Sequence, residues 1–194
     1  MTRKQASLAA VRKALPTDAR RLAELAERTF REAFEATNTP ENMAQHCRET
    51  YGEAIQAREI SDPGRVTLVC ERDGRMVGYA QLRWGPPPRS VVGAAPGEIQ
   101  RIYVAGECHG RGVAQRLMQA CLDELGSRGS DVAWLGVWEH NPRAIAFYRK
   151  FGFETVGEQV FPVGTDPQRD LVMSRPLADR PAADAAPGAQ PPGT

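Results

Sequence analysis

A strand, a glycine-rich turn and an amphipathic helix follow one another directly between residues 99 and 125. The strand pattern IQRIYV precedes the turn His109-Gly110-Arg111-Gly112. Apolar side chains with helical spacing then share one face: Val113, Leu117, Cys121 and Leu125. Glycine inside a helix is less favourable than alanine by about 1 kcal/mol, so two glycines here indicate backbone that must stay uncovered. Because free N–H groups at a helix start bind anions, the segment predicts a phosphate-binding turn.

Two common phosphate-binding motifs do not fit this turn. The dinucleotide pattern GxGxxG requires a third glycine where Gln115 stands, and a P-loop requires a closing Gly-Lys-Ser/Thr. The turn is therefore either an anion site of another kind or a tight turn without a ligand.

The composition is that of an ordinary globular chain. Its 194 residues suffice for one domain with a hydrophobic core, and 41% of them are hydrophobic. Because 25 Lys and Arg balance 24 Asp and Glu, the charge gives no support for a nucleic-acid partner. No apolar run approaches the roughly 20 residues of a membrane span, and the amino-terminal segment lacks a secretion-signal pattern. We expect a cytoplasmic protein with no membrane partner.

The cysteines indicate neither disulfides nor a metal site. Cys47, Cys70, Cys108 and Cys121 form no CxxC pair, and no His/Cys set has zinc spacing. We expect buried, reduced thiols and no metal.

Strand and helix patterns alternate along the chain. Strands are predicted over 7–14, 98–104, 132–138, 155–161 and 169–174, with a hairpin over 65–84 that turns at Asp73-Gly74. Helices are predicted after the cap Asp18, over 41–60 as one helix or a broken pair, over 113–125, and from the cap Asn141 and Pro142 to Gly152. An irregular loop spans 85–97. The order βααβββαβαββ predicts an α/β (α+β) fold with a mixed sheet flanked by helices.

Domain boundaries follow from composition. Residues 1–177 are expected to form a single domain, and the Ala/Pro-rich segment 178–194 is expected to be disordered.

Two motifs resemble the GNAT superfamily of acetyl-CoA-dependent N-acetyltransferases. The family's pyrophosphate motif Gln/Arg-x-x-Gly-x-Gly/Ala reads His109-Gly110-Arg111-Gly112-Val113-Ala114 here, and His109 departs from its first position. A second element, Asn followed by A-x-x-x-Y-x-K-x-G-F, is matched over 141–153. The resemblance covers about residues 66–177. It implies a GNAT-type sheet with a splayed central strand pair, acetyl-CoA as co-substrate, and a small-molecule or peptide amine acceptor, and it allows a homodimer.

The resemblance also implies the residues that bind acetyl-CoA. They come from the strand, the turn and two helix starts: Ile102, Tyr103, Val104, His109, Gly110, Arg111, Gly112, Val113, Ala114 and Asn141. The pantetheine arm would lie in the splay beside this strand. Apolar residues occupy both parities of 98–104, which either a bulge near Gln100 and Arg101 or two-sided burial explains.

The implied reaction is the attack of an amine on a thioester, which needs an acid, a base and a polariser of the carbonyl. Tyr148 matches the tyrosine of the family motif and is the expected acid for the departing thiolate; a packed core tyrosine is the alternative. Glu98 lies where many relatives carry a catalytic carboxylate and is the candidate base, with a solvated strand-end glutamate as the alternative. The Val104 N–H is the expected polariser by family analogy.

The acceptor is less well specified. The segments WLGVWEHNPRAIAFYRKFGF and PVGTDPQRDLVM look similar to a bacterial spermidine/spermine N-acetyltransferase subgroup. A polyamine would need carboxylates near the thioester, and the candidates are Glu98, Glu139, Asp166 and Asp170. His140 is a further candidate on the acceptor side. The alternatives are another small amine, an amino acid or a protein N-terminus, a non-catalytic acyl-CoA-binding regulatory module, or a nucleotide-binding module.

Overall fold

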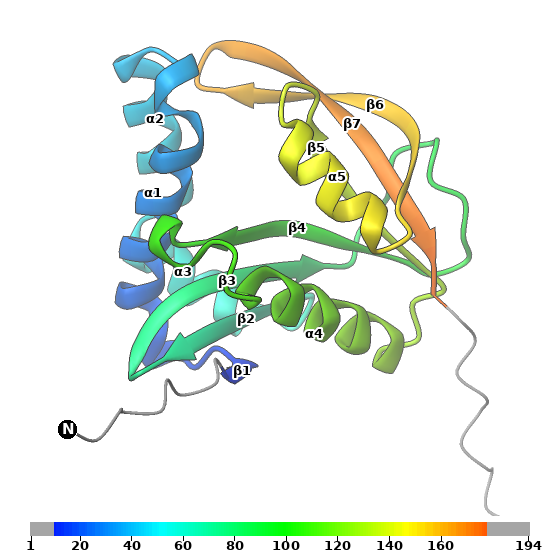
Figure 1. The fold of residues 1–194 in the computed structure, drawn as a ribbon, viewed down its shortest axis with the longest axis horizontal. Helices are drawn as coiled ribbons and strands as arrows, with labels where there is room; N and C mark the ends of the chain where they lie inside the picture. The colour runs from blue at the N-terminus through cyan, green and yellow to red at the C-terminus, as the bar shows by residue number, and fades with distance from the viewer. Residues whose placement is uncertain (1–9, 178–194) are drawn as a thin grey trace, which may run out of the picture.

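A computed structural model describes residues 10–177. Within this range seven strands form one mixed sheet, and five α-helices pack against it (Figure 1). The strands are β1 (Ala10–Lys13), β2 (Arg65–Arg72), β3 (Arg75–Arg83), β4 (Pro96–Val104), β5 (Val132–Trp138), β6 (Glu154–Val163) and β7 (Asp166–Pro176). The helices are α1 (Ala19–Phe34), α2 (Pro40–Thr50), α3 (Glu53–Ser61), α4 (Val113–Ser127) and α5 (Pro142–Lys150). Short 3-10 turns lie at η1 (Pro16–Asp18), η2 (Glu35–Thr37) and η3 (Gly106–Cys108). The segment 178–194 and the first residues of the strand predicted over 7–14 lie outside the described residues.

The sheet has the strand order β1-β2-β3-β4-β5-β7-β6. Neighbouring strands are antiparallel except for β4 and β5, which run parallel and are connected through α4. Figure 1 shows β5, β7 and β6 turning away from β4. The prediction of a mixed sheet with a splayed central pair is confirmed.

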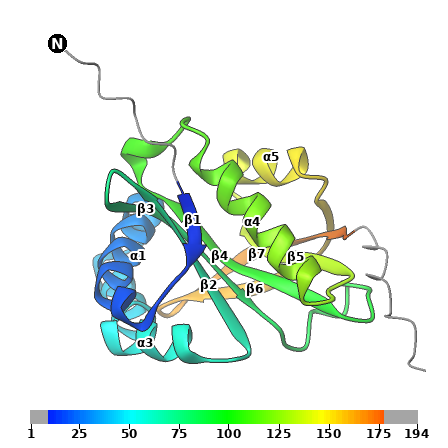
Figure 2. The same cartoon turned by 90° about the horizontal axis from the view of Figure 1, so that it is seen from below.

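Helices cover both faces of the sheet and enclose two apolar cores. α4 and α5 lie on one face, where Leu117, Leu135 and Tyr148 belong to one buried cluster. α1 and α2 lie on the other face, where Leu22, Met43 and Tyr79 belong to a second cluster. Figure 2 shows α1 and α3 on the side opposite α4 and α5. A group placed between β4 and β5 would therefore meet one apolar cluster on the side of α4 and α5, and a second cluster on the side of α1 and α2.

Local sequence explains where several elements begin and turn. The hairpin of β2 and β3 turns at Asp73 and Gly74, whose φ angles of 51° and 74° suit Asp and Gly. Asn141 caps α5 by accepting a hydrogen bond from the Ala144 N–H at 3.0 Å, and Pro142 occupies the first helical position. Both predictions are confirmed.

The predicted cap of α1 is wrong. Asp18 has helical backbone angles and makes no side-chain cap bond to α1. Its carboxylate instead accepts from the Leu15 N–H at 2.8 Å and pairs with Arg12 at 2.6 Å. The ion pair with Arg12 and the hydrogen bond within the preceding 3-10 turn therefore replace a capping bond to α1.

The segment predicted over 41–60 is the broken pair, α2 and α3. Thr39 caps α2 by accepting from the Asn42 N–H. The chain breaks at Tyr51 and Gly52, because Tyr51 turns its ring into the core with 3% of its surface exposed. The order of elements therefore contains one more helix than βααβββαβαββ.

β4 contains the bulge that its sequence allowed. Gln81 of β3 lies opposite Arg101, and the next residue, Leu82, lies opposite Ile99, so Gln100 is the extra residue. This shift reverses the alternation along β4. As a result Ile99 and Ile102 both contact the core beneath α4, while Tyr103 faces α1.

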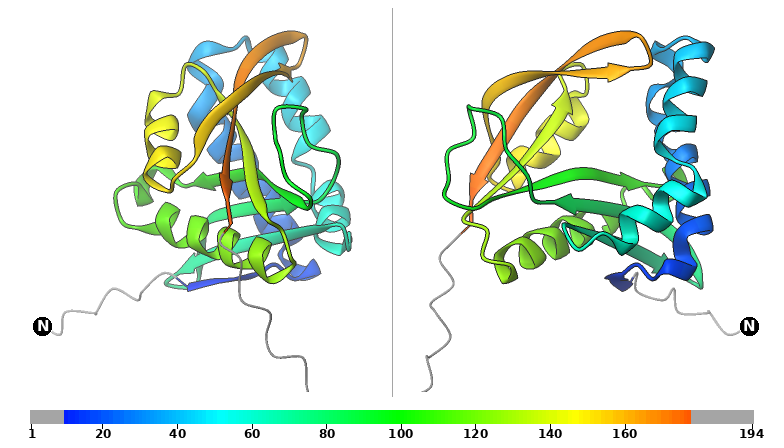
Figure 3. Two further views of the ribbon diagram at one scale, coloured as in Figure 1. Left: turned by 90° about the vertical axis from the view of Figure 1, so that its right-hand side faces the viewer. Right: turned by 180° about the vertical axis from the view of Figure 1, so that it is seen from behind.

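The β6–β7 hairpin reaches over the gap toward α2. The Thr165 N–H donates to the Asn42 side chain at 3.2 Å, and Gln168 donates to Asn38 at 2.8 Å. Both views in Figure 3 show the turn of this hairpin close to the upper end of α2. The carboxyl ends of β4 and β5 are thus bounded by α1, α2 and the hairpin.

Candidate active site

β4 and β5 pair over a short stretch and then separate. Glu98 and Trp134 are the last residues that lie opposite each other, although β4 continues to Val104 and β5 to Trp138. The Ala105 N–H donates to Val77 of β3 at 2.9 Å. Because successive N–H groups point to opposite edges of a strand, the Val104 N–H points to the edge that β5 has left. The open edge of β4 therefore presents an unpaired peptide N–H.

The glycine turn lies between this open edge and α4. Gly110 and Gly112 have φ angles of 73° and 78°, and a side chain on either would meet no atom within 4 Å. Crowding by protein atoms therefore does not explain glycine at these two positions, but the left-handed backbone does, because glycine adopts it without strain.

Several peptide N–H groups at this turn have no acceptor. Across residues 10–177, no hydrogen bond uses the N–H of Gly110, Gly112, Val113, Ala114 or Gln115. Val113 and Ala114 open α4, so these donors lie at the positive end of the helix. This donor set fits a pyrophosphate, and it supports the anion-binding interpretation over a turn without a ligand.

His109 occupies the turn with both ring nitrogens engaged. Its Nε2 lies 2.9 Å from the Val104 carbonyl oxygen, and its Nδ1 lies 3.3 Å from the Arg143 guanidinium. Since a guanidinium only donates, Nδ1 accepts and Nε2 carries the proton. The ring thus ties the end of β4 to the start of α5.

Arg143 is a residue that the sequence analysis missed. Its contact with His109 brings a positive charge to the glycine turn, beside the exposed Arg111. The available signal was an arginine in the first turn of a helix, where cations are unfavourable unless an anion is near.

Tyr148 lies on α5 beneath the gap. Its side chain belongs to the core with Leu135 and Phe153, and 8% of the residue is exposed. No hydrogen bond to its hydroxyl is present among residues 10–177, yet this oxygen is not among the fully enclosed, unpaired polar atoms. Burial chiefly, then the nearby Tyr103, Cys121 and Asp170, raises its pKa well above the usual value. The hydroxyl is therefore protonated and available as a donor.

Asn141 and Ile102 flank the same gap. The Asn141 carbonyl oxygen caps α5, which leaves its amide N–H groups unused by other described residues. Ile102 packs against the core beneath α4, and Tyr103 stacks on Tyr79 with ring centroids 5.7 Å apart. The residues expected to bind acetyl-CoA thus gather at the open edge of β4 and the adjacent starts of α4 and α5.

Glu98 lies at the point where the gap between β4 and β5 begins, and it is paired with an arginine. It faces Arg83 across the β3–β4 ladder, and the Arg83 Nη2 lies 3.1 Å from its Oε1, with a second contact through Nε. Only 7% of Glu98 is exposed. Glu98 is therefore neither solvated nor free of a compensating charge.

The face toward α1 and α2 carries aromatic rings and one buried acid. Trp138 of β5 lies opposite Asp170 of β7, and the Phe34 ring lies 5.9 Å from the Trp138 ring. Tyr103 reaches this face from β4. Burial raises the pKa of Asp170 to about 6.

Glu139 and Asp166 are less available to a ligand. Arg169 forms ion pairs with Glu139 and, at 3.2 Å, with Glu158, and this pairing lowers the pKa of Glu139. Asp166 is exposed at the hairpin turn and accepts from Gln168 at 3.0 Å. His140 is exposed and lies edge-on to Trp138.

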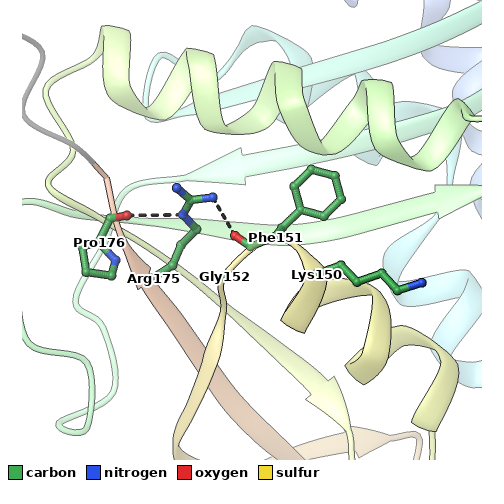
Figure 4. Close-up of a pocket in the computed structure, with 5 residues that line it drawn as sticks. All are labelled: Lys150, Phe151, Gly152, Arg175 and Pro176. Carbon is green, nitrogen blue, oxygen red and sulfur yellow. Dashed lines mark hydrogen bonds between the residues drawn. The ribbon is translucent and has the colours of Figure 1, made fainter.

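A shallow open hollow lies elsewhere, at the carboxyl end of α5. Lys150, Phe151, Gly152, Arg175 and Pro176 line it. Figure 4 shows the Arg175 guanidinium donating to the backbone oxygens of Phe151 and Pro176, so its charge is held by the chain itself. This hollow lies at the opposite end of α5 from Asn141.

The four cysteine side chains are buried, as predicted, and none is paired with another. Over the described range, no set of three or more His, Cys, Asp or Glu residues is arranged to hold a metal ion. None of the helices in residues 10–177 combines the length and apolarity needed to cross a membrane.

Comparisons with known proteins agree with this geometry. Residues 19–153 match the description of the acetyltransferase (GNAT) family. An uncharacterized N-acetyltransferase of Mycobacterium tuberculosis is 37% identical over 161 residues, which cover 83% of this chain and 99% of the relative. One of Lactobacillus delbrueckii subsp. lactis is 32% identical over 153 residues, covering 79% and 88%.

A solved structure shares the fold. The PaiA N-acetyltransferase from Thermoplasma acidophilum in complex with coenzyme A has a TM-score of 0.71 at 19% identity and covers 88% of this chain and 99% of that one. The family match and the relatives covered almost end to end show that this chain belongs to the GNAT family and is an acetyl-CoA-dependent N-acetyltransferase.

Proposed function

We propose that the chain acetylates a primary alkyl amine by direct attack of the amine on the thioester. Polyamines such as spermidine belong to this class of acceptor. The observation that carries this proposal is that the Tyr148 side chain is buried beneath the gap, and its hydroxyl has no hydrogen-bond partner among residues 10–177. The donors of the glycine turn and the Val104 N–H lie along the same gap.

Acetyl-CoA supplies a thioester whose sulfur departs as a thiolate. The Val104 N–H donates to the oxygen on which charge develops, as in other preorganised oxyanion sites. Tyr148 then delivers its proton to the departing sulfur. A thiol has a pKa near 8.5, and burial keeps the pKa of Tyr148 above the usual value, so Tyr148 suits the acid rather than the base.

Asn141 and the amino end of α4 hold the co-substrate. The Asn141 amide N–H groups donate toward the pantetheine arm. The peptide N–H groups of the glycine turn that have no acceptor among residues 10–177 donate toward the pyrophosphate: those of Gly110, Gly112, Val113 and Ala114. His109 contributes by fixing the turn through its bonds to Val104 and Arg143. Arg143 and Arg111 add positive charge beside the phosphates.

The acceptor class rests on the distribution of acids. A polyamine needs carboxylates for several ammonium groups, but Glu98 and Glu139 are each paired with an arginine. Asp170 remains for the reacting nitrogen, and Asp166 lies exposed at the hairpin for a second one. Another small amine, an amino acid or a protein N-terminus needs only the first of these, and each is a comparison in the test.

A thiol-release assay over an amine panel tests this function. The panel contains spermidine, a simple alkyl monoamine, amino acids and a short peptide with a free N-terminus, each with acetyl-CoA. We expect turnover with primary alkyl amines. Calorimetry with acetyl-CoA, ATP and NAD separates the alternatives: tight acetyl-CoA binding without turnover on any amine would support a non-catalytic module instead.

A further inference from the structure

Asp170 is a buried carboxylate that has no partner in the part of the chain that the structure describes. It lies on β7 with 8% of its surface exposed, and no hydrogen bond or ion pair to its side chain is present among residues 10–177. Burying a carboxylate without a compensating donor or charge is costly, so such residues are rare unless a ligand supplies the partner.

Asp170 lies on the face of the sheet that is turned toward α1 and α2, which we take as the acceptor side of the gap. Its neighbour Leu171 packs toward α4 and α5, so Asp170 points to the opposite face of the sheet, where α1 and α2 lie. There it stands between Trp138 of β5 and Gln159 of β6 in the ladders of β7. A Cβ atom on Gly136 would lie 2.5 Å from the Gln159 Nε2 and 3.1 Å from the Asp170 Oδ2. Glycine at position 136 therefore lets the Gln159 amide and the Asp170 carboxylate both approach β5.

Asp170 acts electrostatically on both tyrosines of the gap. Burial is the main cause of the raised pKa values of Tyr103 and Tyr148, and the negative charge of Asp170 raises both further.

The surrounding charges do not compensate Asp170. Burial alone raises its pKa to about 6, with no opposing contribution from a cation. The titratable and charged groups on the packed elements include Tyr103 and Arg101 of β4, Tyr148 of α5, His140 and Glu139 after β5, Glu158 of β6, Arg169 of β7 and His46 of α2. Arg101 is paired with Glu59 at 2.9 Å. Arg169 is taken up by Glu139 and Glu158, and burial lowers the pKa of His46, which keeps it neutral.

We propose that Asp170 binds the ammonium group of the acceptor and takes one proton from it. This role rests on the proposed function. The ammonium N–H bond breaks, its electron pair stays on nitrogen, and the proton moves to the Asp170 carboxylate. The nitrogen pair then forms the N–C bond while the carbonyl π pair moves to oxygen. When that pair returns, the C–S bond breaks, sulfur leaves with its electrons, and the Tyr148 proton joins it. The second nitrogen proton restores the Tyr148 hydroxyl through water, and Asp170 releases its proton to solvent.

The aromatic surroundings define the class of acceptor. Trp138 lies opposite Asp170 in the β5–β7 ladder, and Tyr103 lies on the same face of the sheet. Aromatic side chains beside a carboxylate favour a cation on an apolar stem. A primary alkylammonium meets this description, whereas an anionic group next to the reacting nitrogen would meet the Asp170 charge. We therefore expect amino acids, whose carboxylate adjoins the amine, to be poor acceptors.

The pH dependence of D170N tests the role of Asp170. The wild type uses the abundant ammonium form, so kcat/KM levels off above about pH 6. Without Asp170 the enzyme depends on the free amine, so kcat/KM of D170N should rise about tenfold per pH unit toward an amine pKa near 10.4. The deficit should be about 10²-fold or more at pH 7 and shrink with rising pH.

Matched measurements separate this role from general damage. D123N removes an exposed carboxylate on α4 and should leave kcat/KM unchanged. Calorimetry of D170N with coenzyme A should give a Kd within a few-fold of the wild-type value. Carbon-13 NMR of the free protein should show a wild-type carboxyl that titrates near pH 6 and is absent from D170N.

Three results would contradict the role of Asp170 or the proposed function. A wild type that turns over, with D170N retaining its kcat/KM and pH profile, overturns the role of Asp170 alone. A D170N deficit that is equal at every pH, or confined to KM, overturns proton transfer by Asp170. A wild type that acetylates no amine of the panel overturns the proposed function, and the role of Asp170 with it.

Discussion

Arg83 and Glu98 form an ion pair at the point where β4 and β5 separate. The two residues lie opposite each other in the β3–β4 ladder, and the guanidinium contacts both carboxylate oxygens. The Glu98 side chain is 9% exposed and the Arg83 side chain 41% exposed. Bidentate pairing of this kind fixes a side chain and compensates its charge.

This pair changes the expected result of E98Q. A general base at position 98 predicts a loss of kcat/KM that is largest at neutral pH and shrinks toward the amine pKa. A carboxylate held by Arg83 predicts instead a loss that is the same at every pH, because only the geometry of the gap changes. We expect the second result, together with a decrease of about 1–2 kcal/mol in the free energy of unfolding.

Kinetics of E98Q between pH 6 and 9, with denaturant unfolding of the same protein, check this expectation. R83M serves as the matched variant, because it removes the partner and leaves the carboxylate. If E98Q lost most at pH 7 and R83M were unaffected, Glu98 would be the base predicted from the sequence.

Tyr148→Phe tests the acid. The substitution keeps the ring that packs against Phe153 and removes only the hydroxyl. We expect the Kd of acetyl-CoA to stay within a few-fold, while kcat falls about 10²-fold, on the scale of general acid catalysis. Because a thiolate leaves tolerably without help, acceptors that attack slowly should show a smaller fall.

Steady-state kinetics and calorimetry measure these two quantities separately. Phe147→Leu is the control, since Phe147 adjoins Tyr148 on α5 but carries no hydroxyl. Wild-type turnover by Tyr148→Phe in a folded protein would return Tyr148 to the packed-core interpretation.

Much of the fold could be predicted from the sequence because local patterns determined it. The Asp73-Gly74 turn, the Asn141-Pro142 start of α5 and the apolar strand 132–138 each carry a strong local signal, and each is present. Asp18 shows the limit of such signals. Its side chain stands at the start of α1, where it could cap the helix, but it forms an ion pair with Arg12 instead. The sequence near α1 does not predict this ion pair.

The site could be predicted only in part, for a related reason. The glycine turn and Tyr148 belong to segments whose residue spacing matches a recognisable sequence motif. The partners of His109, Glu98 and Asp170 come from other strands and helices, so they depend on register and on the separation of β4 from β5. Whether a carboxylate is paired or unpaired decides its chemistry, and composition contains no such information.

Gly112→Ala tests the anion site. At a φ of 78° an L residue is strained by roughly 1 kcal/mol, so the variant loses some stability for reasons unrelated to binding. Gly129→Ala is a matched control, because Gly129 has a φ of 81° at the other end of α4 and also lies in open space. We expect similar melting temperatures for the two variants.

Their affinities for acetyl-CoA should differ. Gly112→Ala places a methyl group where the phosphates approach the peptide N–H groups, so we expect its Kd to rise at least tenfold. Gly129→Ala should bind like the wild type. Equal affinities measured by calorimetry would remove the pyrophosphate from this turn.

Asp170→Asn should also change stability with pH. Burial raises the pKa of Asp170 from 3.8 to about 6, so the folded protein holds this proton more tightly than the unfolded chain. The tighter binding of this proton adds to the free energy of unfolding. The contribution is fully present below about pH 4 and is lost as the pH rises through 6. Above that, the wild type retains an ionised, buried carboxylate that the asparagine variant lacks.

The variant should therefore be more stable than the wild type at pH 8, and the difference should shrink toward zero at pH 4. A shift of about two pKa units corresponds to about 3 kcal/mol, which partial access of water to the carboxylate reduces to about 1–2 kcal/mol. Thermal unfolding at pH 4, 6 and 8 should show the variant melting roughly 2–8 °C higher at pH 8. D123N should show no such trend, because its carboxylate is exposed. A stability difference that is constant across this range would mean that Asp170 ionises in the folded protein as it does in the unfolded chain.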